Sequence, residues 1–165
     1  MVSFNELKYF TSVTSLSSTA FMGCSKLISV DFSNLISGAS QMCRNTKIVY
    51  AWFPKIKTVG STASQGYTAW FYGNSQLIAI RVDEATSLNM ISQNAKYMVC
   101  TMSNVPPIND VSYIPSKIYV PDSLVQSYQS GTGYSGKTVL PLSQISIDYP
   151  DCPWLDDLRQ KGFIN

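Results

Sequence analysis

CSKLISVDF, the stretch Cys24–Phe32, is the first of four similar stretches in this chain. The others are NTKIVYAWF (Asn45–Phe53), NSQLIAIRV (Asn74–Val82) and, more faintly, NAKYMVCTM (Asn94–Met102). Each begins with Cys or Asn, has an apolar residue three positions later, and continues with apolar residues at alternate positions. Such alternation is typical of a β-strand with one buried face. Because the stretch recurs along the chain, the sequence predicts a solenoid, in which each repeat packs on its neighbours.

The spacing of the repeats narrows the type of solenoid. The strand centres fall about 18 to 29 residues apart, close to the range of leucine-rich repeats. A shorter apolar segment precedes each strand, so each unit holds two short apolar segments and a turn. The longest unit contains the insertion Ser61–Thr68, STASQGYT, whose glycine and hydroxyl groups favour a surface loop. The strand centres are Asp31, Trp52, Arg81, Thr101 and Tyr119.

The residues that open the repeats are expected to form a structural ladder. They are Cys24, Asn45, Asn74 and Asn94. The backbone of a solenoid bends sharply before each strand and leaves N–H and C=O groups without strand partners. A side-chain amide can satisfy such groups in the neighbouring repeat, and Cys is a compact substitute at an end repeat.

The repeats resemble a known family. AFMGCSKLISVDF (Ala20–Phe32) resembles the repeat of the BspA-like leucine-rich-repeat family, which occurs in bacterial surface proteins and some phage or prophage proteins. Ser3–Leu16 is similar to the segment that often leads into those repeats, and Lys117–Ser130 to the segment that often closes them. The resemblance implies an α/β fold: a right-handed solenoid with a parallel β-sheet on one face and capped ends. It also implies adhesion or ligand recognition.

The two ends of the repeat array are expected to be capped by short helices, within a domain of residues 1–147. The first spans about residues 3–10, with Phe4, Leu7 and Phe10 on one face and a capping box of Ser3 and Glu6. Lys117–Val120 is expected to be the final strand. The second cap spans about residues 122–130, with Asp122 as its N-cap.

Residues 148–165 form a separate tail with a short amphipathic helix, expected to end at Gly162. Its apolar side is made by Trp154, Leu155 and Leu158. Two interpretations remain open: the tail packs back on the domain, or the segment Trp154–Ile164 docks on another chain and gives an oligomer.

The composition disfavours several classes of function. Charged residues make up 13% of the chain and the net charge is +2 without a basic run, which favours neither nucleic acid nor an anionic membrane as a partner. No apolar stretch has the length of a membrane-spanning helix, so membrane insertion is not expected. The four cysteines are irregularly spaced and there is no His, so we expect buried free thiols and no metal site.

Motifs that resemble catalytic sites are weak. Gly131–Thr138, GTGYSGKT, satisfies the phosphate-loop pattern, with Lys137 as its lysine, but the residues before it suggest a helix and Pro141 follows closely. Nucleotide binding is therefore a remote alternative. The carboxylate pairs Asp83-Glu84 and Asp156-Asp157 are adjacent in sequence, which does not suit a glycosidase. A serine triad of the common kind is excluded because there is no His. We expect no enzyme activity and no cofactor.

The outward residues of the strands are the best candidates for ligand binding. If residues such as Val30 and Phe32 point inward, the alternate residues form an exposed row. Aromatic residues beside Arg resemble the residues that dominate binding interfaces, although they could equally be ordinary cross-strand pairs. The candidate ligand-binding residues are Tyr50, Trp52, Arg81, Asp83 and Tyr119.

The sequence therefore predicts a non-enzymatic recognition or adhesion module that binds protein or glycan through its strand face. The alternative is a structural or assembly subunit that docks through its tail. The N-terminus does not resemble a signal peptide. We expect a cell-surface or extracellular location if a leader is missing from this chain, and otherwise a phage- or virion-associated or cytoplasmic one.

Overall fold

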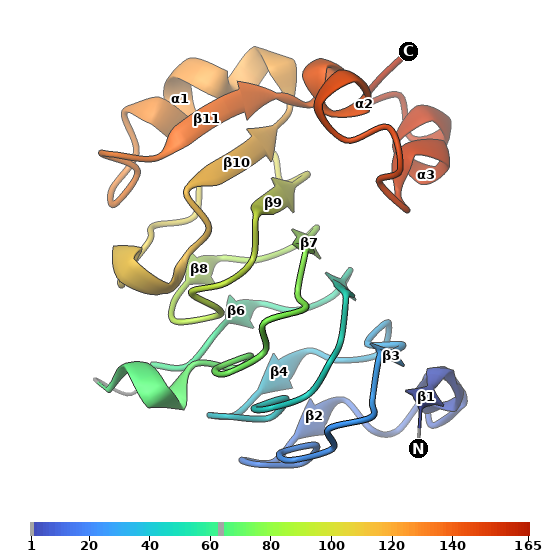
Figure 1. The fold of residues 1–165 in the computed structure, drawn as a ribbon. Helices are drawn as coiled ribbons and strands as arrows, with labels where there is room; N and C mark the ends of the chain where they lie inside the picture. Colours follow the sequence, from blue (N-terminus) through green and yellow to red (C-terminus); the bar gives the residue numbers. More distant parts are fainter. Residues whose placement is uncertain (1, 63–64) are drawn as a thin grey trace.

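The structure is a computed structural model that describes residues 2–62 and 65–165 (Figure 1). It is a mixed α/β fold built on a five-stranded parallel sheet in the order β11-β10-β9-β7-β5. A parallel sheet with few, short helices was predicted, and this part of the prediction is confirmed. The strands are β5 (Tyr50–Phe53), β7 (Ala79–Val82), β9 (Tyr97–Cys100), β10 (Lys117–Val120) and β11 (Thr138–Pro141).

Smaller parallel pairings join neighbouring turns of the chain. Figure 1 shows these turns lying one above another, from the blue N-terminal end to the red C-terminal end. In the described residues, the two-stranded sheets pair β1 (Ser3–Phe4) with β3 (Ser29–Val30), β2 (Ser15–Leu16) with β4 (Ser37–Gly38), and β6 (Thr58–Val59) with β8 (Ser87–Leu88).

The helices are short and lie mostly in the C-terminal third. Over the described residues, none is long and apolar enough to cross a bilayer. The 3-10 turns are η1 (Asn5–Tyr9), η2 (Gly66–Thr68), η3 (Val111–Tyr113), η4 (Asp122–Leu124) and η5 (Leu142–Gln144). The α-helices are α1 (Val125–Gln129), α2 (Ile145–Asp148) and α3 (Leu155–Gln160). Of the predicted insertion Ser61–Thr68, Ala63 and Ser64 lie outside the described residues.

The core lies on the inner face of the sheet, and the apolar alternation of the strands accounts for it. Every second strand residue is buried there, which confirms the inward set predicted from the alternation. The rings of Phe32 and Phe53, which occupy equivalent places in successive repeats, stack with centroids 4.7 Å apart. The core residues of these strands are Val30, Phe32, Ala51, Phe53, Ile80, Val82, Met98, Cys100, Ile118 and Val120.

The register of the fourth repeat differs from the prediction by two residues. Trp52 is paired with Arg81, Arg81 with Val99, and Val99 with Tyr119. Val99 therefore occupies the central outward position that was predicted for Thr101. The error arises because Asn94 was aligned with Asn74. In the structure, the strand begins two residues earlier than this alignment predicts.

The opening position of the fourth repeat belongs to Ser92. Its buried hydroxyl accepts a hydrogen bond from the N–H of Asn94 at 3.1 Å, and the Oδ1 of Asn74 accepts in the same way from the N–H of Gln76 at 3.0 Å. Ser is a poorer match to the repeat than Asn94, which explains the misalignment.

The predicted ladder fails at its first two members. Cys24 and Asn45 are both exposed. Asn45 has a φ of 56°, so it adopts the left-handed conformation that Gly73 adopts with a φ of 73° just before Asn74. The polar residue that is buried at the bend of this repeat is Thr46, whose hydroxyl lies 3.2 Å from the Nδ2 of Asn74.

Asn74 and Asn94 do bond between successive repeats. Asn74 is fully buried, and its Nδ2 donates to the carbonyl of Ile48 at 3.0 Å. Asn94 donates to the carbonyl of Asn74 at 3.1 Å. These bonds satisfy carbonyls at the bends of the chain, where no strand partner is available.

The N-terminal cap is not the amphipathic α-helix that was predicted. Ser3 and Phe4 form strand β1, and the turn that follows is a 3-10 helix without a side-chain cap, so the capping box does not form. Only Leu7 of the predicted stripe is buried, while Phe10 is 53% exposed. Pairing of β1 with β3 takes the residues that the helix would have used.

The C-terminal end also departs from the prediction. β10 is not the last strand, because β11 pairs with it over four residues and forms the edge of the sheet. Pro141, which was interpreted as unfavourable to a helix, ends that edge strand, where proline is tolerated. The cap helix is split into η4 and α1, and Asp122 is not its N-cap. Instead, Asp122 Oδ1 accepts a hydrogen bond from the N–H of Ser143.

Candidate ligand-binding face

The outer face of the sheet is divided between a covered part and an open part. The C-terminal segment from η5 to α3 packs against β7, β9 and β10 and buries both sides of these strands (Figure 1). The tail therefore packs back on the domain, which was one of its two predicted arrangements. The shared cluster comprises Ala79, Tyr97, Val99, Tyr119, Leu142, Ile145, Cys152, Trp154, Leu155, Leu158 and Ile164.

Two of the predicted ligand-binding residues lie beneath this segment. Arg81 and Tyr119 are fully buried, so the expectation that they form part of an exposed row is wrong. The strand alternation correctly placed them on the outer face. It could not show that another part of the chain covers that face.

Arg81 is held by groups of its own chain. Its Nε donates to Asp83 Oδ1 at 2.8 Å, and its Nη2 lies 2.6 Å from Asp157 Oδ2 on α3. The guanidinium carbon lies 4.7 Å from the ring centroid of Trp52. A buried guanidinium requires such partners, because an unpaired charge in the interior is costly.

The carboxylate of Asp83 is likewise bonded to groups of its own chain. Besides Arg81, it accepts hydrogen bonds from the Nε1 of Trp52 at 2.9 Å and the hydroxyl of Thr101 at 2.8 Å. Lys161 of the tail lies 3.9 Å from Asp83 Oδ2 and 5.4 Å from the Trp52 ring. Arg81, Asp83 and the polar edge of Trp52 thus hold the tail on the sheet and orient the Trp52 ring.

Tyr119 has a similar internal role. Its hydroxyl donates to Asp148 Oδ2, and burial is the main reason that the pKa of Tyr119 is raised. The pKa of Asp148 is lowered, chiefly by this hydrogen bond; burial opposes the shift, while Gln144 and Lys117 add to it. Lys117 Nζ lies 3.7 Å from the carboxylate. Tyr119 therefore fixes α2 to the sheet.

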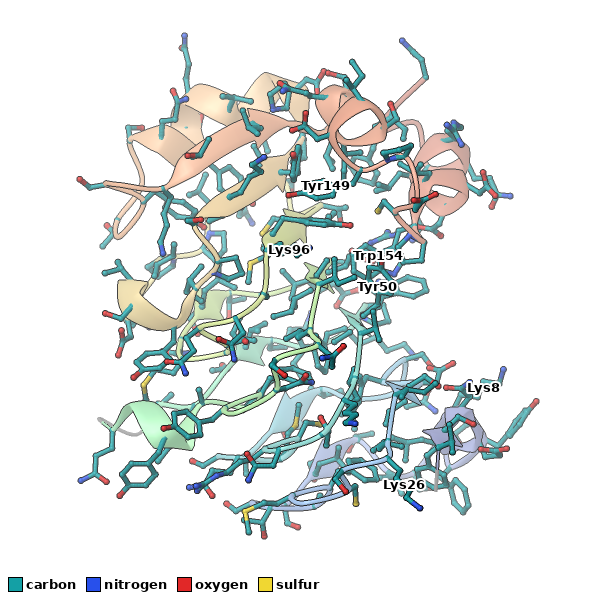
Figure 2. The ribbon with its side chains drawn as sticks, in the orientation of Figure 1. Lys8, Lys26, Tyr50, Lys96, Tyr149 and Trp154 are labelled. Carbon is teal, nitrogen blue, oxygen red and sulfur yellow. The ribbon has the colours of Figure 1, made fainter. Side chains whose placement is uncertain are left out.

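The open part of the face contains a cleft of about 330 Å³ between η1 and the tail. Tyr50 and Trp52 of β5 are half-buried along it. Trp154 contributes an aromatic wall from the tail, with its ring centroid 5.9 Å from that of Tyr50 and the two planes at 78°. Figure 2 shows Tyr50 beside Trp154, with Lys8 on the N-terminal side. Asp31 supplies a carboxylate.

A second cleft, of about 260 Å³, lies on the other side of Tyr50. Tyr149 lines it and stacks on Tyr97, with centroids 4.0 Å apart and planes at 25°. Lys96 (Figure 2) and Asp151 contribute opposite charges to this cleft. Both clefts are formed by rigid strands on one side and by the tail on the other.

The Tyr50 phenol stays protonated at neutral pH. Burial is the main reason that its pKa is raised, and the neighbouring Cys152 and Asp151 raise it further. A neutral phenol can both donate and accept a hydrogen bond. Tyr50 can therefore contact a ligand through its ring and its hydroxyl.

Sequence reasoning missed several residues of these clefts as ligand contacts, among them Lys8, Lys96, Tyr149, Asp151 and Trp154. Trp154 was assigned to a helix that packs or docks, and Tyr149 lies at the start of the same tail. The available signal was the concentration of aromatic residues and prolines between Tyr149 and Trp154, which is unusual for a solvent-exposed tail.

The phosphate-loop pattern has the wrong surroundings for nucleotide binding. The chain enters Gly131–Thr138 from helix α1 and leaves it into strand β11, whereas a phosphate loop follows a strand and starts a helix. Lys137 donates to the carbonyls of Val111 and Ile114 at 2.6 and 2.7 Å. The lysine therefore ties this loop to η3. Its pKa is lowered, mainly by desolvation.

Comparisons with protein-family models, curated proteins and solved structures found no match to this chain. Among residues 2–62 and 65–165 there is also no cluster of three or more His, Cys, Asp or Glu side chains that could hold a metal ion.

Proposed function

We propose that this chain is a non-enzymatic recognition module, built as a leucine-rich-repeat solenoid of the BspA-like type, that binds protein or glycan through the open part of its strand face. The observation that carries the proposal is the cleft in which Tyr50, Trp52 and Trp154 meet Asp31 and Lys8. Aromatic rings beside a few polar groups, held on a rigid scaffold, are typical of a recognition site.

The solenoid interpretation is supported by the way in which the turns pair. Equivalent strands of successive repeats are parallel and in register, as Trp52 with Arg81 shows. The amides of Asn74 and Asn94 bond from one turn to the next. A module of this kind suits an adhesive protein of the cell surface or of a phage particle.

A binding role is favoured over catalysis by the state of the reactive groups. Burial raises the pKa of the Cys43 and Cys100 thiols, so these side chains stay protonated and unreactive. Asp83 and Asp148 are engaged by internal cations and hydroxyl groups. Neither is positioned as a free general acid or base.

The alternative role in assembly through the tail has less support, because Leu158 is fully buried and Trp154 nearly so in contact with the chain's own sheet. Docking on a partner through these residues would require the tail to detach. Light scattering decides this point: oligomers that disappear on truncation after Ile147 would favour assembly, and a monomer would exclude it.

The proposed function is tested on an array that carries both immobilised proteins and immobilised glycans. Tyr50→Ala should lose capture of the probes that the native protein retains, with a melting temperature close to native. Tyr67→Ala is the matched control, because Tyr67 is 48% exposed on η2 and lines neither cleft. If Tyr50→Ala captures the probes normally, the strand face is not the binding site.

A further inference from the structure

The two clefts lie next to each other, one on each side of Tyr50, and are referred to together as the groove. Tyr50 lines both of them. One wall is the tail segment of residues 149–154, which lines the second cleft through Tyr149 and Asp151 and the first through Trp154. The opposite wall is made by the first residues of the strands, since Tyr50 and Tyr97 stand at equivalent positions on β5 and β9. The groove therefore crosses the strands.

The length of the groove suits a chain ligand. Strands β5, β7 and β9 are adjacent in the sheet, so the second cleft extends over two strand spacings, or about 10 Å. The first cleft continues past Tyr50 to Asp31, directly after β3. A single small molecule would fill one cleft and leave the other open. An extended ligand can fill both.

The charges along the groove balance. Lys8 and Asp31 line the first cleft, and Lys96 and Asp151 line the second. Asp148 also lines the second cleft, but Lys117 and the Tyr119 hydroxyl already partner it. This arrangement gives no preference for a strongly acidic or basic ligand. It offers paired donors and acceptors to a ligand with many hydroxyl groups.

The aromatic residues recur along the groove: the half-buried rings of Tyr50 and Trp52 line the first cleft together with the small exposed part of Trp154 (6%), and Tyr149 lines the second. Tyr149 and Trp154 are both held by other rings, so their orientation is fixed before a ligand arrives. Flat aromatic rings pack against the apolar faces of sugar rings, while side-chain oxygens and ammonium groups bond to the hydroxyls at their edges.

We propose that the groove binds a short linear chain of neutral sugar residues, with Tyr50 at the junction of two sugar-binding subsites. This inference rests on the proposed function and specifies that the ligand is a glycan and not a protein. A specific protein interface covers about 800 Å² on each partner. The two clefts hold only about 330 and 260 Å³, and concave spaces of this size suit a chain of rings better than a flat protein surface.

Calorimetric titration with size-graded neutral oligosaccharides tests the inference. The probes are the gluco-, manno- and N-acetylglucosamine series from monosaccharide to hexasaccharide, and hyaluronate oligomers are the acidic arm. Affinity should rise with length in at least one neutral series and then level off once the groove is full. Tyr50→Ala should lower affinity at every length, by about tenfold or more. Lys96→Ala should weaken only the longer oligosaccharides, because Lys96 lies in the second cleft alone.

Lys96 and Tyr67 are both exposed, so Lys96→Ala and the control Tyr67→Ala are expected to fold normally. No binding in any neutral series, affinity independent of length, or a preference for hyaluronate would overturn the inference. If only proteins are captured and Tyr50→Ala abolishes their capture, the inference is wrong and the recognition function stands. If nothing is captured through Tyr50, the recognition function also fails.

Discussion

Asn74 shows how one side chain holds two turns of this chain together. Its amide donates to the carbonyl of Ile48 and faces the Thr46 hydroxyl in the preceding turn, and its Oδ1 accepts from the N–H of Gln76 in its own turn. Replacing the side chain by a methyl group would leave buried backbone groups without partners. Such groups are costly because water cannot reach them.

Asn74→Ala should therefore lower the free energy of unfolding by about 1–3 kcal/mol. Urea denaturation followed by tryptophan fluorescence measures the change. Asn34→Ala is the control, since the Asn34 amide makes an exposed hydrogen bond to the carbonyl of Lys8 and its loss should cost less than about 0.5 kcal/mol. Equal losses for the two variants would contradict the role given to Asn74.

Asp157 makes stability depend on pH. Burial alone would raise the pKa of Asp157, but hydrogen bonds from Arg81 and Lys161, together with their charges, outweigh it and hold the pKa below its usual value. Because the folded-state pKa lies below the unfolded value of about 3.9, the contribution to stability is complete above about pH 5. It is lost as the pH falls through the folded-state pKa.

Asp157→Asn should lower the free energy of unfolding by about 1–3 kcal/mol at pH 7, and the difference from the native protein should shrink at pH 3. Asp156→Asn makes the same change of charge on a side chain that is 95% exposed, so it should have little effect at either pH. Urea denaturation at pH 7 and at pH 3 measures the differences in the free energy of unfolding. A deficit for Asp157→Asn that stays constant with pH would show that the ion pair with Arg81 does not account for it.

At the scale of elements, the tail is the part that most changes the interpretation of the sheet. The alternation of the strands identified which residues face outward, but periodicity contains no information about what covers a face. Residues 148–165 were separated from the domain because their composition differs from that of the repeats. In the structure, α3 lies over the outer face, and the two clefts beside Tyr50 stay open.

Leu158→Ala tests the packing of the tail. Leu158 is fully buried between α3 and the sheet, so its truncation should destabilise the protein by about 2–5 kcal/mol. Ile147→Ala on α2 is the control, because Ile147 is 79% exposed and should tolerate the change. Thermal unfolding compares the two variants. If Leu158→Ala melts at the native temperature, the tail does not lie on the sheet.

The two ends of the repeat array could not be predicted from local pattern alone. Phe4, Leu7 and Phe10 have helical spacing, but Ser3 and Phe4 pair with β3, a partner more than twenty residues away. Thr138–Pro141 was not identified as a strand, and Pro141 was considered only as a residue unfavourable to a helix. The chain places it at the edge, where the missing N–H does no harm. Both errors arise because the strands pair with residues that are far away in the sequence.

For the whole molecule, the family resemblance implied the parallel sheet, and the repeats predicted its inner core, since apolar alternation in equivalent stretches fixes which side chains meet. The candidate site was predicted in part. Tyr50 and Trp52 do line the open cleft, whereas Arg81, Asp83 and Tyr119 serve to hold the tail. Trp154 and Tyr149 reach the site only through the path of the tail.

If the strand face is the binding site, ligands contact the clefts beside β5 and leave the rest of the surface unchanged. The most direct measurement is an NMR titration of the isotope-labelled protein with the strongest probe from the array. We expect the amide signals of Asp31, Tyr50, Trp52 and the segment of residues 149–154 to shift, while those of α1 and η2 stay in place. Shifts confined to α1 or η2, with the Tyr50 signal unchanged, would contradict it.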